Sequence, residues 1–317
     1  MPSQNELRTQ LTSQILAALD DGVAPWKRPW SNDRNCGRPT NAVTGKPYNG
    51  INILLLSLHS HEYRSEGKYF ATYKQWQSLG GQVMARPSGV PKGKWAAKGI
   101  LYKAVTKTKT NSRGEEVEDT FCFMREFSLF NIDQVEGGQI AHLRPGYCDE
   151  TDPEVSIREA DELIENAGID IFHGGNKAFY EPGIDAITMP HKHQFDGTAY
   201  FETLFHEAAH WAIERLKMKI DNDHNRYAME ELVAEMSSCF MCSELGIPLA
   251  EGLENHAAYV GNWAKKLHDA VDVDPSFILK ASTQASKVCD YLLQFRPAPA
   301  EEAAVTGLQW TPALAMS

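Results

Sequence analysis

The sequence predicts an α+β protein with two domains. An N-terminal α/β domain is expected over residues 1–140 and a mostly helical C-terminal domain with a small sheet over residues 150–295. At 317 residues the chain is long enough for two ordinary domains, each with its own core. Residues 1–125 hold 18 Lys and Arg against 10 Asp and Glu, whereas the other 192 residues hold 13 against 32. This division of charge indicates two domains with different partners, the basic one suited to a polyanion.

The first half combines helices with one long hairpin. Its helices have amphipathic or apolar patterns and are expected over residues 4–20, 50–60 and 70–81, the last closed by two glycines. Residues 23–50 are dense in Pro, Gly and Asn and predict a long structured loop. Residues 99–108 and 117–130 alternate apolar with polar side chains, which predicts a β-hairpin.

The second half is dominated by helical periodicity. The acidic residues 148–155 are expected to form the linker between the domains. Short strands are predicted over residues 169–173, 177–181 and 184–189. Helices are predicted over residues 157–167, 198–217, 226–244, 252–269 and 275–294. The tail at 296–317 has little periodicity and is expected to be disordered.

Composition excludes a membrane partner and indicates a cytoplasmic protein. No apolar run approaches the roughly 18 residues that a membrane span needs, and the N-terminus lacks the layout of a signal peptide. The six cysteines are scattered without a disulfide framework, which suits a reducing compartment. Cys239 and Cys242 form a CxxC pair within an apolar helical stretch. We interpret this pair as core packing, with redox or metal chemistry as the alternative.

The sequence His206-Glu207-Ala208-Ala209-His210 predicts a metal centre. Positions i and i+4 lie on one face of a helix, so both imidazoles can reach the same cation. The carboxylate of Glu207 lies one residue further along and can take a proton from a water molecule activated by the metal. This arrangement is typical of zinc-dependent hydrolases, with manganese or cobalt as alternative ions. The competing interpretation is an alanine-rich packed helix whose histidines only form hydrogen bonds.

Catalytic zinc needs a third protein ligand, and the next predicted helix offers several carboxylates. We assign Glu231 as the third ligand and Glu235 as the acceptor for the free N–H of a ligand histidine. Glu230 is the competitor for the ligand role. Adjacent helix positions point about 100° apart, and the sequence alone does not fix the rotation of the helix.

The basic half interleaves cationic and aromatic residues. Single-stranded nucleic acid is bound by positive grooves with rings on which bases stack. The candidate contacts are Trp26, Lys27, Arg28, Trp30, Lys46, Tyr48, Lys74 and Trp76. A solvated basic face with its aromatic residues in the core is the alternative interpretation.

Several motifs in fixed order resemble a known family. In the first half they are PWKRPW, PTNAVTGKPYNGIN, YFATYKQWQSLGGQV and FSLFNIDQVEG. In the second half they include DAITMP, FETLFHEAAHW, YAMEELVAEMSS and KASTQASKVCDYLL. From about residue 10 to 294 the chain resembles ArdC-type antirestriction proteins of plasmids and phages. The first half also resembles the N-terminal portion of plasmid conjugation primases. Ala209 is a departure, since glycine is expected there in many relatives.

The resemblance implies an N-terminal domain that binds single-stranded DNA and a C-terminal domain of the zincin-like (gluzincin) metallopeptidase type. It places the metal-binding histidines on His206 and His210, the catalytic glutamate on Glu207 and the acidic ligand within 230–235. We therefore expect an antirestriction protein of the bacterial cytoplasm that binds single-stranded DNA and hydrolyses peptide bonds in a protein of the host restriction system. The alternative is a protein that coats DNA without catalysis and retains a structural or vestigial metal site.

Overall fold

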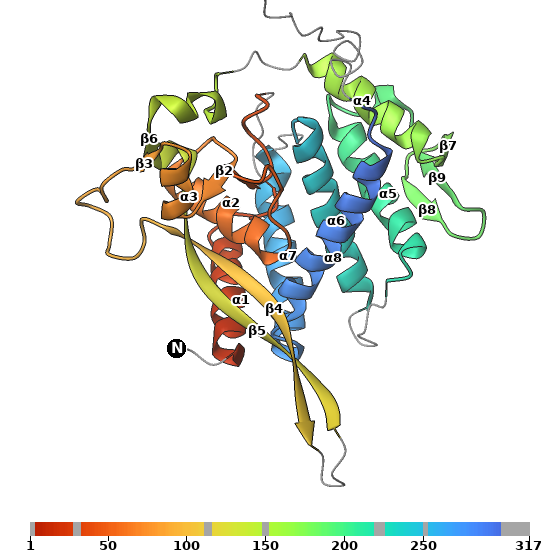
Figure 1. Ribbon diagram of the computed structural model, residues 1–317. Coiled ribbons are helices and arrows are strands. Elements are labelled where there is room, and N and C mark those ends of the chain that lie inside the picture. The colour runs from red at the N-terminus through yellow and green to blue at the C-terminus, as the bar shows by residue number, and fades with distance from the viewer. Residues whose placement is uncertain are drawn as a thin grey trace, which may run out of the picture.

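The two halves of the chain pack side by side, and α8 (Phe277–Leu292) of the second half lies against the first half (Figure 1). The computed structural model describes residues 4–27, 33–110, 116–147, 152–218, 226–249 and 253–298. The elements of the first half are α1 (Gln4–Asp20), β1 (Thr40–Asn41), α2 (Ile51–Tyr63), β2 (Tyr69–Ala71), α3 (Tyr73–Ser78), β3 (Gln82–Val83), β4 (Ala97–Thr110), β5 (Glu116–Asn131), η1 (Ile132–Gln134), β6 (Val135–Glu136) and η2 (Gly138–Leu143). Those of the second half are α4 (Pro153–Asn166), β7 (Asp170–His173), β8 (Phe179–Glu181), β9 (Ala186–Met189), η3 (Lys192–Gln194), α5 (Ala199–Arg215), α6 (Arg226–Leu245), α7 (Leu253–Val273), α8 (Phe277–Leu292) and η4 (Leu293–Phe295).

The N-terminal half is built on a sheet with the strand order β1-β2-β5-β4. The predicted hairpin is confirmed, and its antiparallel register runs from Ala97 opposite Leu129 to Thr110 opposite Glu116. The paired β4 and β5 project away from the rest of the molecule (Figure 1). The predicted helices of this half are confirmed as α1, α2 and α3, although α3 is shorter than the expected 70–81, because residues 70–71 belong to β2. A capping box starts α3, in which the Gln75 N–H donates to the Thr72 hydroxyl and the Thr72 N–H donates to the Gln75 side chain.

The C-terminal half combines helices with a sheet of strand order β7-β9-β8. Strand β9 pairs parallel with β7 and antiparallel with β8, so β8 lies at one edge of this sheet. All five predicted helices and all three predicted strands are present, with ends within a few residues of those expected. Helix α4 starts within the stretch expected to be a linker, because Asp152 caps it and Pro153 occupies its first turn. None of the described helices is long and apolar enough to cross a membrane.

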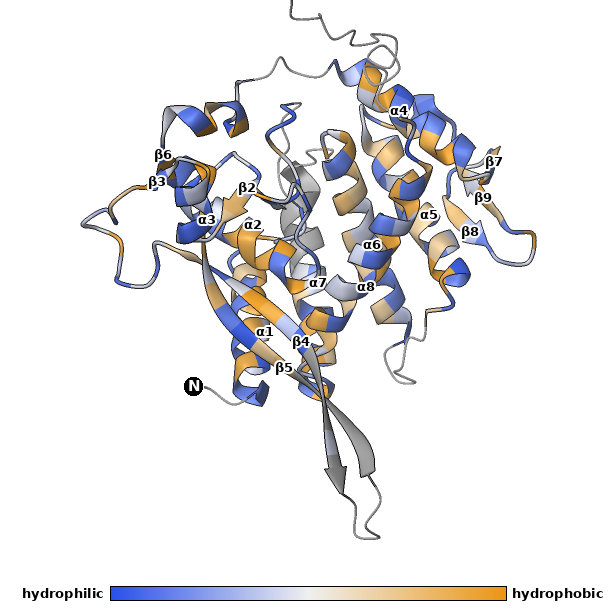
Figure 2. Cartoon of the chain, viewed as in Figure 1, coloured by the Kyte–Doolittle hydropathy of each residue, from blue (hydrophilic) through white to orange (hydrophobic). Residues whose placement is uncertain are grey.

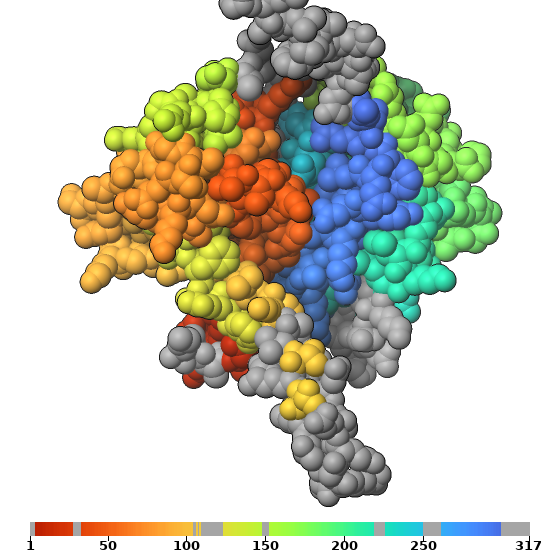
Figure 3. All heavy atoms as spheres, viewed as in Figure 1, coloured from red at the N-terminus to blue at the C-terminus, as the bar shows by residue number. Residues whose placement is uncertain are grey.

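The main hydrophobic core is shared by the two halves, which corrects the expectation of a separate core for each domain. One cluster contains residues from α1 and α2 together with residues from α5, α6 and α8. Apolar residues cover much of α2, which explains how this helix is buried between its neighbours (Figure 2). Two smaller clusters belong to the first half alone. Segments of the first half lie directly against α8 on the molecular surface (Figure 3).

The buried Arg38 joins the long loop of the first half to α6 and α8. Its side chain is only 1% exposed, and its Nη1 lies 3.4 Å from Glu244 and 3.2 Å from Asp290. The same guanidinium donates through Nε to the Tyr48 carbonyl at 3.3 Å and through Nη2 to Asn49. These contacts hold the loop around Arg38 in place, which agrees with the prediction of a structured loop. The tail was expected to be disordered from residue 296, but Arg296 forms an ion pair with Glu159 of α4. Residues 299–317 lie outside the described part of the chain.

Replacing Arg38 with Met should destabilise the whole protein, because it removes the cation shared by Glu244 and Asp290. Removing one partner of a buried ion pair costs about 3–5 kcal/mol, and the loss here should lie at or below the lower end because Asp290 is 50% exposed. Urea unfolding followed by circular dichroism measures the loss. Arg158→Met is the matched control, since that arginine is 67% exposed and its removal should cost well under about 1 kcal/mol. Equal unfolding midpoints for the two variants would contradict this role of Arg38.

Candidate metal centre

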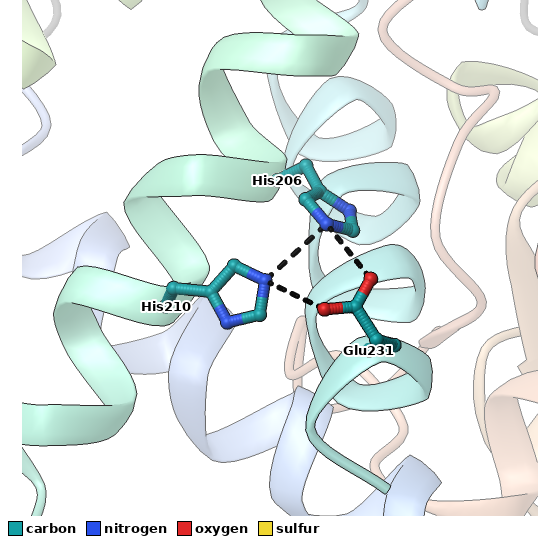
Figure 4. A group of neighbouring side chains, drawn as sticks. All are labelled: His206, His210 and Glu231. Atoms are coloured by element: carbon teal, nitrogen blue, oxygen red, sulfur yellow. Dashed lines mark hydrogen bonds and ion pairs between the residues drawn. The ribbon is translucent and has the colours of Figure 1, made fainter. Parts of the chain in front are cut away.

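Helix α5 presents His206 and His210 on one face, one turn apart. Their Nε2 atoms lie 3.3 Å from each other and point to the same place (Figure 4). The opposite face of α5 is apolar and buried, and its small residues Ala208 and Ala212 are completely buried. Small side chains allow neighbouring helices to approach closely. The sequence of α5 therefore fixes which side of the helix carries the imidazoles.

Helix α6 brings the carboxylate of Glu231 to these two histidines. Its Oε2 lies 3.7 Å from the His206 Nε2 and its Oε1 lies 3.5 Å from the His210 Nε2. Glu230 points elsewhere and pairs with Arg226 at 2.8 Å, one turn earlier on the same helix. The rotation of α6, which the sequence did not fix, thus places Glu231 rather than Glu230 at the histidines.

Glu235 lies on the far side of the His206 ring. Its Oε2 is 3.6 Å from Nδ1, so this imidazole has a carboxylate facing each of its nitrogens. Burial alone would lower the pKa of His206, but Glu231 and Glu235 outweigh it and raise that pKa to about 10. Burial and the neighbouring charge of His206 lower the pKa of His210. The hydrogen bond with His206 is the main cause that lowers the pKa of Glu231.

Glu207 is buried beside this group and is held by the edge strand β8. Its Oε2 accepts a hydrogen bond of 2.9 Å from the backbone N–H of Tyr180. Burial raises the pKa of Glu207, against the opposing effects of His206 and of the Tyr180 N–H. A carboxylate whose pKa is raised towards neutrality is better suited to accept and return a proton at pH 7.

Three residues that were not expected from the sequence fix β8 next to Glu207. The hydroxyl of Tyr180 donates to Asp185 at 2.9 Å, and Arg215 near the end of α5 forms two hydrogen bonds with the same carboxylate. Asp185 has a φ of 55° in the turn between β8 and β9. These three residues are 5 and 30 positions apart, so no local motif marks them.

The three side chains of His206, His210 and Glu231 have the geometry of a divalent metal site. Among the described residues, these three side chains form a group of potential metal ligands whose donor atoms all lie within 4.8 Å of one another. Donors bound about 2.0–2.2 Å from one zinc in a tetrahedral arrangement lie roughly 3.3–3.5 Å apart. The observed separations of 3.3, 3.5 and 3.7 Å are close to those values. Two imidazoles and a carboxylate also match the donor set of zinc hydrolases.

The CxxC pair on α6 belongs to the core. Cys239 and Cys242 are both 0% exposed, and burial raises the pKa of each thiol well above its usual range. A thiol in an apolar surrounding stays protonated and is a poor metal ligand or nucleophile. The interpretation as core packing is confirmed.

Two of the aromatic residues proposed to contact DNA are in the core, which corrects that prediction. Trp26 is 1% exposed and packs edge-on against Trp263 of α7 at 6.4 Å, and Trp76 is 0% exposed. The Nε1 of Trp76 donates to the Phe130 carbonyl at 2.9 Å. A ring in these positions would have to leave the core before it could stack on a base.

The remaining candidate DNA contacts differ in their surroundings. Lys27 forms an ion pair of 3.1 Å with Glu202, one turn before His206 on α5. Tyr48 is half-buried, and its hydroxyl contacts Asn41 and the Phe70 carbonyl. Lys46 and Lys74 are exposed. Arg28 and Trp30 lie outside the described residues.

Comparison with protein families matches each half of the chain to a different model. Residues 5–130 match the N-terminal domain of the anti-restriction factor ArdC. Residues 158–284 match a zincin-like metallopeptidase.

Two solved structures and two curated proteins are similar to nearly the whole chain. The crystal structure of the antirestriction protein ArdC from plasmid R388 in its metal-free form is 31% identical, with a TM-score of 0.66, covering 92% of this chain and 97% of that one. Its Mn(II)-bound structure is 30% identical with a TM-score of 0.62, covering 91% and 97%. A DNA primase TraC of Escherichia coli is 32% identical over 92% of this chain, which spans only 20% of that primase. An uncharacterized protein of Sinorhizobium fredii is 30% identical, covering 90% of this chain and 91% of its own.

Glu231→Gln should weaken the binding of a divalent cation far more than Glu230→Gln. The first variant removes the negative charge that faces both imidazoles, whereas the second removes a charge that pairs with Arg226. We expect a loss of at least about 100-fold for Glu231→Gln, since even residues that only support a ligand change affinity by 10–100-fold. Isothermal titration with zinc or manganese measures both variants. Similar affinities would show that Glu231 is not a ligand.

Metal binding should release a proton and become tighter as the pH rises. His206, with a pKa of about 10, is protonated at neutral pH and must lose that proton to offer a lone pair. One released proton corresponds to an increase in affinity of about tenfold per pH unit between pH 7 and 8.5. Titrations in two buffers of different ionisation enthalpy count the proton. Glu235→Gln should reduce the release, and an affinity independent of pH would contradict the expectation.

Proposed function

We propose a function on one premise: the chain belongs to the family of ArdC-type antirestriction proteins. In this proposal the C-terminal half is a zinc-dependent peptidase, with manganese or cobalt able to replace zinc. The N-terminal half binds single-stranded DNA. Together they protect incoming plasmid or phage DNA from restriction in the bacterial cytoplasm.

The peptidase proposal is carried by the meeting of four side chains from two helices. His206 and His210 from α5 and Glu231 from α6 face one point, and Glu207 lies beside them, held by the N–H of Tyr180. A structural metal site needs no carboxylate poised as a base, and its coordination is closed by four protein ligands. Three ligands leave a position open for a substrate, as in catalytic sites.

A divalent cation at this point supplies Lewis acidity, which polarises a peptide carbonyl and lowers the pKa of water. The residues of the chain have separate roles in the reaction. Glu207 takes a proton from the attacking water and returns it to the nitrogen of the leaving amine. Glu235 faces the Nδ1–H of His206 and accepts its hydrogen bond, which would keep the Nε2 lone pair directed at the cation. Tyr180 keeps the Glu207 carboxylate in place through its backbone N–H.

Binding of single-stranded DNA is supported by the charge of the first half and by its family. Residues 1–125 carry eight more cationic than anionic side chains. They match the N-terminal domain of ArdC, and the chain is similar to primases, which act on DNA. Lys46 and Lys74 are exposed and available for phosphates. The second candidate function is protection by coating alone, for which this basic half is sufficient.

Glu207→Gln distinguishes the two functions. Glutamine keeps an acceptor for the Tyr180 N–H but cannot carry the proton, so hydrolysis of peptide substrates should fall by about 10²–10⁴-fold. Metal affinity and the unfolding temperature should be unchanged. Glu214→Gln, an exposed residue on the same helix, is the control and should retain full activity.

The same two variants are then compared for plasmid protection in a restricting host. Loss of protection in Glu207→Gln alone assigns the effect to peptide hydrolysis. Full protection in that variant assigns it to DNA coating instead. A Glu207→Gln protein that still cleaves peptides at the normal rate would rule out the proposed mechanism.

A further inference from the structure

A pocket of about 400 Å³ lies in the N-terminal half, away from the metal centre along the chain. It forms where the C-terminal end of α2 meets the segment before β4, the short helix η1 and the end of η2. Its lining includes Tyr63, Arg64, Trp95, Asp133, Gln134 and Arg144. The volume falls in the range of about 300–1,000 Å³ that is typical of small-molecule sites.

Two aromatic rings form one wall of this pocket. Tyr63 and Trp95 lie edge to face, with centroids 5.5 Å apart and planes at 84°. Each ring is fixed by a hydrogen bond from its polar atom to the backbone: the Tyr63 hydroxyl donates to the Lys94 carbonyl at 2.9 Å and the Trp95 Nε1 donates to the Met84 carbonyl at 3.1 Å. Both residues are half-buried, so the rings form a rigid wall beside which a planar group can stack.

The floor of the pocket offers one hydrogen-bond acceptor. Both polar atoms of the Gln134 amide are engaged, since its oxygen accepts from the Asn131 N–H at 2.8 Å and its nitrogen donates to the Trp95 carbonyl at 2.6 Å. Asp133 differs, because its Oδ2 accepts from the backbone N–H groups of residues 66 and 67, whereas its Oδ1 has no partner within the described residues. This oxygen of the half-buried Asp133 can accept a hydrogen bond from an amino group.

The rim carries a guanidinium in an unfavourable backbone conformation. Arg64 follows the last residue of α2 with a φ of 52°, a region that glycine and asparagine adopt more easily than arginine. Its side chain is exposed, and no hydrogen bond or ion pair engages it within the part of the chain that the structure describes. The nearby Arg144 is instead held by the Val135 and Ile132 carbonyls. The Arg64 guanidinium is therefore available to a ligand at the rim of the pocket.

We infer that this pocket binds one base of an unpaired DNA strand. The base stacks beside Trp95 and Tyr63, its exocyclic amino group donates to Asp133, and Arg64 pairs with a neighbouring phosphate. Cytosine presents an amino donor where thymine presents a carbonyl acceptor. The pocket should therefore prefer cytosine to thymine. The inference rests on the proposed binding of single-stranded DNA and names where that binding occurs and which base it favours.

The experiment uses the full chain and fluorescently labelled oligo(dC) and oligo(dT), with anisotropy measured at several salt concentrations. The unmodified protein should bind oligo(dC) several-fold more tightly than oligo(dT). Arg64→Asn should weaken both complexes by about 3–10-fold and reduce the salt slope by about 0.7, as the loss of one phosphate contact on a single strand predicts. Its unfolding temperature should not fall, because asparagine fits the backbone conformation better than arginine.

Asp133→Asn tests the floor of the pocket by its effect on base preference. If the amide oxygen keeps the two backbone N–H groups, its amino group faces the base, and a donor replaces the acceptor. The preference for oligo(dC) over oligo(dT) should then disappear or reverse. Arg158→Asn on α4, which removes the same charge as Arg64→Asn, is the control and should leave affinity, salt slope and preference unchanged.

The outcomes separate this inference from the proposed function. If the unmodified chain binds oligonucleotides but Arg64→Asn and Asp133→Asn behave like Arg158→Asn, DNA binding stands and the pocket assignment is wrong. If the unmodified chain binds no single-stranded DNA, both are wrong. Binding of deoxycytidine monophosphate as tightly as of oligo(dC), or a preference for an RNA strand, would also overturn the assignment to a base of a DNA strand.

Discussion

The packing of α5 against α6 is the constraint on which the candidate site depends. Two imidazoles from one helix cannot form a three-ligand site by themselves, and the third donor must come from a partner helix at a fixed distance and rotation. Buried alanines on α5 and the hydrogen bond of 2.6 Å from the Ser238 hydroxyl to the Glu202 carbonyl hold the two helices together. The result is a set of donor atoms separated by the distances that a single cation requires.

The same packing gathers three carboxylates around His206. Glu207, Glu231 and Glu235 all act to raise the pKa of this imidazole, and their mutual repulsion is relieved by positive charge at the centre. Without a metal that charge is a proton on His206, and with a metal it is the cation itself. Folding and metal binding are therefore linked through the protonation of one side chain.

The N-terminal half contributes to the position of α5 as well as to a basic surface. Lys27 pairs with Glu202 one turn from His206, and Trp26 beside it is inserted against Trp263. Arg38 connects the same long loop to α6 and α8. The motif PWKRPW, which the sequence suggested as a DNA contact, is thus in its first residues a structural contact with the metal-binding half. This is why the halves, so different in charge, share one core.

The sequence by itself determined the elements and the local chemistry. The period of apolar residues predicted the α-helices, the long hairpin and the sheet of the second half, but not the short strands β1, β2, β3 and β6. The i, i+4 spacing placed His206 and His210 on one face, because it depends only on neighbouring residues. Tertiary structure decided everything that depends on rotation and distance between elements. It turned Glu231 rather than Glu230 towards the histidines, placed Tyr180 over Glu207, and buried Trp26 and Trp76, whose types suit a core and a stacking surface equally well. It also assembled the pocket of Tyr63, Trp95 and Asp133 from segments up to about 70 residues apart, for which no local pattern exists.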